Sequence, residues 1–157
     1  NNASRFYPTK VGSTGMSQWD DLMDSNLRGP YFLTQALLPE LTTAGGSIVN
    51  LIDIHAVKPM AGHAVYCMAK AGLQMMTLAL AKELGPEIRV NGVAPGAILW
   101  PEQEDGLEHQ QNILSKVVMA RAGSPEDIAS AVVYLGLDAP YVTGQVLAVD
   151  GGRSLNM

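Results

Sequence analysis

The spacing of apolar and polar positions changes several times along the chain, and each change predicts a different element. Short apolar runs that end at turn-forming residues are typical of buried strands, and they cover 47–52, 87–93 and 145–149. Apolar positions recur at helical spacing over 17–41, 63–84 and 124–137. Strands that alternate with amphipathic helices indicate an α/β fold with a parallel sheet.

Capping residues define the predicted helix boundaries more closely. Ser17 is predicted as the N-cap of the first helix, because Asp20-Asp21 in the first turns suits the positive end of the helix dipole. Gly29-Pro30 should bend this helix, since proline has no N–H to donate. Ser124, followed by Pro125-Glu126-Asp127, is predicted to cap the last helix.

The segments between these elements are predicted as loops and turns. Residues 1–4 are interpreted as the end of a buried strand, and residues 5–15 and 54–62 as loops. Residues 100–111 are polar and acidic and contain a proline and a glycine, which is typical of a mobile lid over a site. Residues 150–152 are predicted to form a tight turn.

Composition narrows the classes of function. The chain has 157 residues, 47% hydrophobic and 16% charged, so it can bury a core. A net charge of -5 without a basic cluster argues against nucleic acid and anionic membrane surfaces as partners. No apolar stretch approaches the length that a membrane span needs. The single cysteine, Cys67, indicates a reducing compartment, so a cytoplasmic location is expected.

The histidines do not form a recognisable site. His55, His63 and His109 are scattered, and with one cysteine they give no metal-ligand spacing, so no metal is expected. Each is interpreted as a solvated side chain, with His63 at a plausible helix start.

Tyr66 and Lys70 are the strongest candidates for chemistry. They are four residues apart, so on a helix they lie one turn apart on the same face. An ammonium beside a phenol lowers a pKa that is ordinarily about 10, and such a tyrosine can transfer a proton near neutral pH. The alternative is a packed tyrosine and a solvated amine. Asp53 favours the active site, because ligands of open α/β sheets bind at the carboxyl ends of strands.

Tyr66-Cys67-Met68-Ala69-Lys70 matches the Tyr-x-x-x-Lys signature of the short-chain dehydrogenase/reductase family, which the chain resembles over nearly its whole length. The other matching segments are Asn1-Asn2-Ala3, where Ser4 replaces the glycine of the family's Asn-Asn-Ala-Gly motif, Asn26, Val90–Gly96, Val142–Gln145 and Val149–Gly152. The resemblance implies a Rossmann-like doubly wound parallel sheet. It also implies a homotetramer in which the two long helices pair with their symmetry mates.

One departure narrows the resemblance. The family usually has a serine thirteen residues before the tyrosine, where this chain has Asp53. Asp53, with Ser4 and Phe6 upstream, resembles the pteridine reductases, including the bacterial dihydromonapterin reductases. This implies hydride transfer from NADPH to a C=N bond of a pterin. Tyr66 would donate the proton, Lys70 would lower the pKa of Tyr66 and bind the nicotinamide ribose, and Asp53 would orient the pterin or Tyr66 and relay a proton.

The resemblance also assigns the remaining site residues. Asn26 either faces solvent or holds a water near the catalytic lysine. Phe6 is expected to stack on the pterin ring, the alternative being that it packs its loop onto the sheet. The implied substrate-binding residues are Ser4, Phe6, Asp53 and Tyr66. The implied cofactor-binding residues are Asn2, Ala3, Ser4, Tyr66, Lys70, Pro95, Gly96, Ala97 and Ile98.

No glycine-rich phosphate-binding loop occurs in these residues. The resemblance therefore implies that residues 1–157 are the C-terminal part of a single domain. The N-terminal half of the fold, with the residues that select NADPH over NADH, would be absent from this chain. We expect cofactor binding only together with that half.

Two other functions remain open. An ordinary short-chain reductase would act on a ketone, fatty-acyl, sugar or steroid carbonyl, but Asp53 removes the hydroxyl that stabilises an oxyanion there. A cofactor-binding or oligomer-forming paralogue with a vestigial site is disfavoured because Tyr66, Lys70 and Asn26 are all present.

Overall fold

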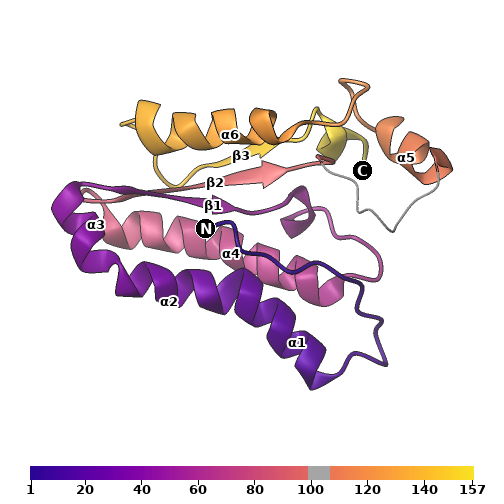
Figure 1. Ribbon diagram of the computed structural model, residues 1–157, viewed down its shortest axis with the longest axis horizontal. Coiled ribbons are helices and arrows are strands. Elements are labelled where there is room, and N and C mark those ends of the chain that lie inside the picture. The colour runs from indigo at the N-terminus through magenta and orange to yellow at the C-terminus, as the bar shows by residue number, and fades with distance from the viewer. Residues whose placement is uncertain (99–106) are drawn as a thin grey trace.

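A parallel sheet with helices on both faces forms the described part of the chain (Figure 1). The structure is a computed structural model that describes residues 1–98 and 107–157. The predicted α/β fold with a parallel sheet is confirmed.

Three parallel strands in the spatial order β1-β2-β3 form the described sheet. They are β1 (Ser47–Leu51), β2 (Arg89–Pro95) and β3 (Val146–Val149). In the central strand, Gly92 pairs with Asn50 on one side and Val146 on the other. Residues 1–4 form no regular strand, but the Leu51 N–H donates to the Asn1 carbonyl at 3.0 Å, so the first residue pairs alongside β1.

Helices cover the two faces of the sheet, and α4 is the longest of those described. On the α4 face the helical elements are α1 (Met16–Met23), the π-helical η1 (Asp24–Arg28), α2 (Gly29–Ala36), α3 (Leu38–Ala44) and α4 (Ala64–Leu84). The others are the 3-10 turn η2 (Ile54–Ala56), α5 (Leu107–Leu114), α6 (Pro125–Val133), the π-helical η3 (Tyr134–Asp138) and the 3-10 turn η4 (Arg153–Asn156).

Each face of the sheet buries its own apolar cluster. Between α4 and the sheet lie Ile48, Ile52, Leu73, Met76, Leu80, Ile88 and Val90. On the opposite face, α6 and η3 place Ala131 and Leu135 against Val93. Because apolar burial on both faces fixes the strands between the helices, the carboxyl ends of β1, β2 and β3 are held at one edge of the sheet.

The first helix starts earlier than predicted. It begins at Met16 after Gly15, so the prediction of Ser17 as N-cap is wrong. The reason is that the Gln18 side chain reaches back and accepts the Gly15 N–H at 3.0 Å. A side-chain acceptor at the third helical position can thus replace a capping hydroxyl before the helix.

The predicted bend at Gly29-Pro30 takes the form of a π-helical segment directly before it. The Gly29 N–H donates to the Asp24 carbonyl, five residues back, instead of four. Pro30 has no N–H for the carbonyl four residues before it, which favours the wider winding. The predicted continuous helix to residue 41 is also interrupted at Leu37, where the backbone leaves helical geometry before α3 begins.

The last predicted helix has the predicted cap. The Ser124 hydroxyl accepts the Asp127 N–H at 3.3 Å, and the Asp127 carboxylate accepts the Ser124 N–H at 2.9 Å. Residues 100–106 of the predicted lid (100–111) lie outside the described residues. Its final part forms the start of α5 rather than a loop.

Helix α4 corrects the expectation about membrane-spanning length. Its 21 residues are long and apolar enough to cross a membrane, with a hydropathy of 1.3 over 18 residues. Half of that window is buried inside the protein. In this fold α4 is the core helix against β2, and core helices commonly meet the same criterion.

We predict that a hydrogen bond between α4 and β1 stabilises the core. Thr77 is fully buried; its hydroxyl accepts the Asn50 Nδ2–H at 2.9 Å and donates to the Leu73 carbonyl at 2.8 Å. Thr77→Val keeps the branched shape but leaves the buried Asn50 amide short of an acceptor. We expect a loss of about 1–3 kcal/mol in the free energy of unfolding, measured by urea denaturation.

The matched control is Thr43→Val, at an exposed position where the hydroxyl donates only to the Pro39 carbonyl. This change should alter the free energy of unfolding by less than about 0.5 kcal/mol. Equal losses in the two variants would show that the buried pair contributes nothing special.

Candidate active site

Asp53 and Tyr66 meet at the carboxyl end of β1. The Tyr66 hydroxyl donates to Asp53 Oδ2 at 2.7 Å, and the His55 N–H donates to Asp53 Oδ1 at 2.8 Å. Asp53 is therefore the N-cap of the short turn η2, with its second oxygen turned to the tyrosine. The two residues predicted to act together are in direct contact.

Tyr66 and Lys70 lie one turn apart on α4, and both are buried. The Lys70 ammonium donates to the Leu51 carbonyl at 2.9 Å and lies 5.7 Å from the centroid of the Tyr66 ring. The solvated-amine alternative is therefore wrong. The last residue of β1 holds the ammonium close to the phenol without a direct bond between them.

The pKa of Tyr66 is raised well above its ordinary value. Burial is the main cause, and the Asp53 carboxylate adds to it through its negative charge and its hydrogen bond. The prediction that the neighbouring lysine lowers this pKa is wrong for this arrangement, because the nearest charge to the hydroxyl is an anion. Burial also lowers the pKa of Lys70 to about 8, which Asp53 partly opposes.

These contacts determine what the site can do chemically. A tyrosine whose proton is held in a hydrogen bond to a carboxylate remains protonated, and the carboxylate can return a proton after the tyrosine has given one away. The arrangement thus fits a proton donor with a proton relay behind it. It does not resemble an activated phenolate.

Asn26 ties the N-terminal segment to the π-helical turn. It is fully buried, so the alternative in which it faces solvent is wrong. Its Oδ1 accepts the Ser4 hydroxyl at 2.7 Å, and its Nδ2 donates to the carbonyls of Arg5 and Leu22, each at 2.9 Å. The side chain therefore positions the segment that carries Ser4. The proton route through a water stays a prediction.

Phe6 forms an aromatic wall beside the Tyr66 ring. One face of its ring stacks on His63, with centroids 4.9 Å apart and an interplanar angle of 9°. Its ring and the Tyr66 ring form a T-shaped pair, with centroids 4.9 Å apart and an interplanar angle of 77°. Phe6 remains 47% exposed, which leaves part of its ring open to a ligand.

Two histidines were misjudged from the sequence. His55 is buried, with its Nδ1 2.8 Å from the Lys58 carbonyl, so the solvated interpretation is wrong. His63 is the N-cap of α4, as its position suggested, but its ring contact with Phe6 was missed. The proximity of an aromatic and a histidine 57 positions apart gives no local sequence signal. Among the described residues no cluster could hold a metal ion.

The predicted cofactor-binding residues lie in two segments near the same sheet edge. Asn2, Ala3 and Ser4 are exposed beyond the residue that pairs with β1. The turn from Pro95 to Ile98 is half-buried at the end of β2, and the Gly96 N–H donates to the Val149 carbonyl at 3.1 Å. A Cβ at position 96 would lie 2.8 Å from the Asp150 Cα, so only glycine fits at this position of the turn.

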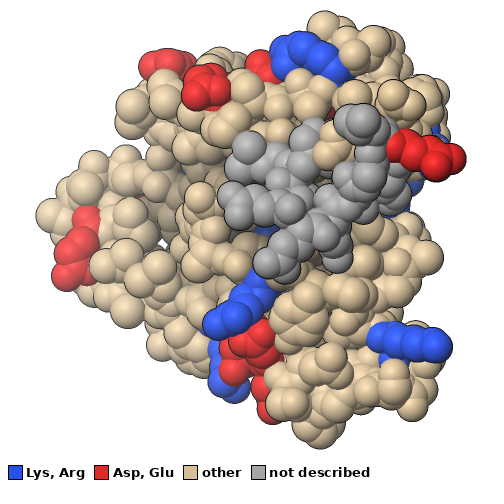
Figure 2. Space-filling view, turned by 45° about the vertical axis from the view of Figure 1, so that its right-hand side comes forward, with Lys and Arg blue, Asp and Glu red and all other residues tan. Residues whose placement is uncertain are grey.

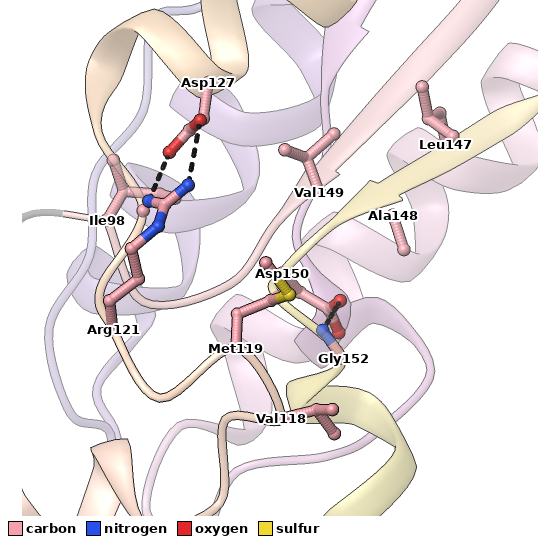
Figure 3. Close-up of a pocket in the computed structure, with 12 residues that line it drawn as sticks. Ile98, Val118, Met119, Arg121, Asp127, Leu147, Ala148, Val149, Asp150 and Gly152 are labelled. Atoms are coloured by element: carbon pink, nitrogen blue, oxygen red, sulfur yellow. Dashed lines mark hydrogen bonds and ion pairs between the residues drawn. The ribbon is translucent and has the colours of Figure 1, made fainter.

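A cavity of about 500 Å³ lies between β3, α6 and the loop of residues 118–123 (Figure 3). Ile98 lines it, whereas the lining residues do not include Asp53, Tyr66 or Lys70. Arg121 and Asp127 form an ion pair at 2.8 Å across its rim. On the face shown in Figure 2, basic side chains lie singly or beside acidic ones. The cavity is thus separate from the proton-transfer residues.

Comparisons with known proteins place this geometry in a family. A family model described as enoyl-(acyl carrier protein) reductase matches residues 1–154. A 3-oxoacyl-(acyl-carrier-protein) reductase of Thermotoga maritima is 40% identical over 138 residues, which is 85% of this chain and 56% of the relative.

Relatives named for pterins are similarly close. Pteridine reductase 1 of Leishmania tarentolae is 36% identical over 179 residues, covering 99% of this chain and 62% of the relative. Dihydromonapterin reductase of Enterobacter sp. strain 638 is 34% identical over 158 residues, covering 99% of this chain and 65% of the relative. The chain thus spans less than two thirds of the length of these curated relatives.

A solved structure agrees with the fold. A protein from Agrobacterium tumefaciens, assigned as a 2-deoxy-d-gluconate 3-dehydrogenase and holding bound NADP, superposes with a TM-score of 0.90 at 34% identity. The match covers 97% of this chain and 65% of that chain. The predicted Rossmann-like architecture is confirmed by this likeness.

The lowered pKa of Lys70 makes a testable prediction about stability. It falls from 10.5 in the unfolded chain to about 8 in the fold. Between these values the unfolded chain holds the proton and the folded chain does not, so stability rises with pH across this window. Relative to Lys70→Met, the wild type should gain at most about 3 kcal/mol between pH 7 and 10.5, measured by urea denaturation at each pH.

Lys82→Met is the matched control, since Lys82 lies exposed on the same helix. Its pH dependence should follow the wild type. If Lys70→Met also follows the wild type throughout the window, then the ammonium is not perturbed by burial.

Proposed function

Because the chain belongs to the short-chain dehydrogenase/reductase family, we propose that it is the catalytic part of an oxidoreductase that reduces pterins with NADPH. The observation that carries this proposal is the hydrogen bond from the Tyr66 hydroxyl to the Asp53 carboxylate. The relatives named for pterins support the substrate class, and the acyl-carrier relatives are the reason for testing it against carbonyls.

A carboxylate suits protonation of a ring nitrogen. Reduction of a C=N bond adds a hydride to carbon and a proton to nitrogen, and the nitrogen carries little negative charge if the proton arrives early. Tyr66 supplies this proton, and Asp53 receives a proton from solvent and passes it to the phenolate left on Tyr66. Reduction of a ketone instead builds an oxyanion, which a carboxylate at position 53 would repel.

The residues present fit a nicotinamide cofactor. Lys70 has three N–H donors, and the described contacts use one of them on the Leu51 carbonyl. The other two can bind ribose hydroxyls, with Tyr66, the segment 2–4 and the turn 95–98 completing the cofactor contacts. NADPH supplies the hydride when it is bound. The neighbour that holds NADP supports the choice of this cofactor over NADH.

Phe6 positions the substrate in this proposal. The exposed part of its ring would stack on the flat pterin, while the stack on His63 holds the Phe6 ring beside the Tyr66 ring. Ser4, fixed by Asn26, contributes a polar group at the same place. The ring to be reduced would thus lie between the aromatic wall and the cofactor.

We further propose that the complete protein is a cytoplasmic homotetramer. A groove of about 410 Å³ runs between α2 and α4 and is lined by Tyr31, Phe32, Met75 and neighbouring residues. These three side chains are 44–62% exposed. An apolar surface of this kind between α2 and α4 supports the pairing of this face with a second copy.

The test of the reaction is NADPH oxidation by the complete protein, with a dihydropterin and a panel of ketones as substrates. Tyr66→Phe removes the proton donor and Asp53→Asn the relay, so each should reduce turnover of the dihydropterin at least about 100-fold. Tyr134→Phe and Asp138→Asn, both exposed on the far side of the sheet, are the matched controls and should retain wild-type rates.

Asp53→Ser separates the two substrate classes, because it restores the hydroxyl that the family usually carries. The ratio of pterin to ketone turnover should fall at least about tenfold in this variant. Ketone turnover alone in the wild type, or wild-type rates in Tyr66→Phe, would refute the proposed reaction.

The proposed assembly predicts that charge in the groove dissociates it. Met75→Glu would bury an unpaired carboxylate between copies, whereas the exposed Val57→Glu lies on a loop away from the groove. Light scattering should give a smaller mass for Met75→Glu only. An unchanged mass would mean that this face is not the interface.

A further inference from the structure

Arg153 lies at the sheet edge that carries the proposed site, in the 3-10 turn after β3. The turn before it is fixed by Asp150, whose carboxylate accepts the Gly152 N–H at 2.9 Å (Figure 3). The same carboxylate accepts the Ser154 N–H at 2.8 Å. The Arg153 N–H itself donates to the Asp150 carbonyl at 3.1 Å. The backbone of Arg153 is therefore rigidly placed.

The same turn packs directly on the predicted cofactor turn. Gly96 approaches Asp150 so closely that no Cβ would fit between them. In Figure 1, η4 (yellow) lies beside the ends of β2 and β3, at the sheet edge where β1 also ends. Arg153 thus follows directly on a turn that packs against the predicted cofactor segment.

The Arg153 side chain has an unused donor. Its Nε is buried and has no hydrogen-bond partner among the described residues. Arg89 shows the contrast, because its half-buried guanidinium donates to the carbonyls of Leu135, Gly136 and Val142. A buried N–H without a partner is costly, and an anion bound here would supply the missing acceptor.

The nearby carboxylates already have donors. Asp53 accepts from Tyr66 and His55, and Asp150 accepts from its own turn. Burial lowers the pKa of Arg153, while the charges of Asp53 and Asp150 oppose this, so the guanidinium lies within electrostatic reach of the site. Among the described residues it forms no ion pair within 4.0 Å, unlike Arg5, Arg28 and Arg121.

We propose that Arg153 is a specificity-determining residue that binds an anionic group, a carboxylate or a phosphate, on the part of the substrate remote from the reacting ring. The planar guanidinium can bind either group through two parallel hydrogen bonds. This inference rests on the proposed function, and it narrows the substrate class to pterins with an acidic substituent.

The experiment compares matched substrates in the complete protein with NADPH. Dihydroneopterin is neutral, dihydroneopterin phosphate carries a phosphate, and dihydrofolate carries carboxylates. Arg153→Met should raise KM at least tenfold for one or both acidic substrates and less than twofold for dihydroneopterin, with kcat changed less than twofold. The acidic substrate whose KM rises shows whether Arg153 binds a phosphate or a carboxylate. Arg153→Lys keeps the charge but loses the planar fork. Its KM for the acidic substrate should lie between those of the wild type and Arg153→Met.

Arg121→Met is the matched control, since it removes an exposed guanidinium whose partner is Asp127. It should leave every KM unchanged. Equal KM increases for neutral and acidic substrates would indicate a structural role and overturn the proposal. A change confined to the KM for NADPH would place the charge at the cofactor and would also overturn it.

A binding measurement separates this inference from the proposed reaction. If the wild type reduces none of the three pterins, the proposed function fails. The anion site is then decided by calorimetric titration of the NADP-bound protein with p-aminobenzoylglutamate and with inorganic phosphate. At least tenfold weaker binding of either probe to Arg153→Met supports the site. Equal binding to both proteins, or no binding to the wild type, refutes it.

Discussion

The hydrogen bond between Tyr66 and Asp53 is the contact on which the site depends. It joins the first turn of α4 to the segment after β1, so a helix and a strand end must both be in place before it can form. Lys70 reinforces the same junction from one turn further along, through its bond to the last carbonyl of β1. The two contacts hold a phenol, a carboxylate and an ammonium in a small volume, where burial raises the pKa of Tyr66 and lowers that of Lys70.

The packing of the sheet determines where this junction lies. Parallel strands with helices on both faces put all their carboxyl ends at one edge, and this brings three separate stretches of sequence together there. Glycine makes the closest approaches possible. At Gly92 an added Cβ would come within 2.3 Å of Ile52, directly before Asp53, and at Gly96 it would meet the backbone of the turn after β3. The glycines in the central strand and directly after it are thus needed for the site to form.

Much of this arrangement could be predicted from the sequence, because it depends on local spacing. The four-residue interval of Tyr66 and Lys70 and the strand before Asp53 were enough to place the central residues. Features that depend on tertiary contacts could not be predicted in this way. The stack of Phe6 on His63, the burial of His55 and the bonds of Asn26 to the first loop all join residues with no periodic relation. The direction of the Tyr66 pKa shift was missed for the same reason, since it depends on which charge lies nearest the hydroxyl.

The long sequence separation between the paired strands also affects how the chain folds. Residues 47 and 89 pair between β1 and β2, and residues 92 and 146 pair between β2 and β3. Each pairing closes a long loop of intervening chain. The loop must lose conformational entropy before strand pairing can stabilise the fold. Such high contact order slows folding even when the final state is stable. Before the strands pair, their edges are open to pairing with other chains. The rate of synthesis and the action of chaperones therefore matter more for this topology than for a bundle of helices.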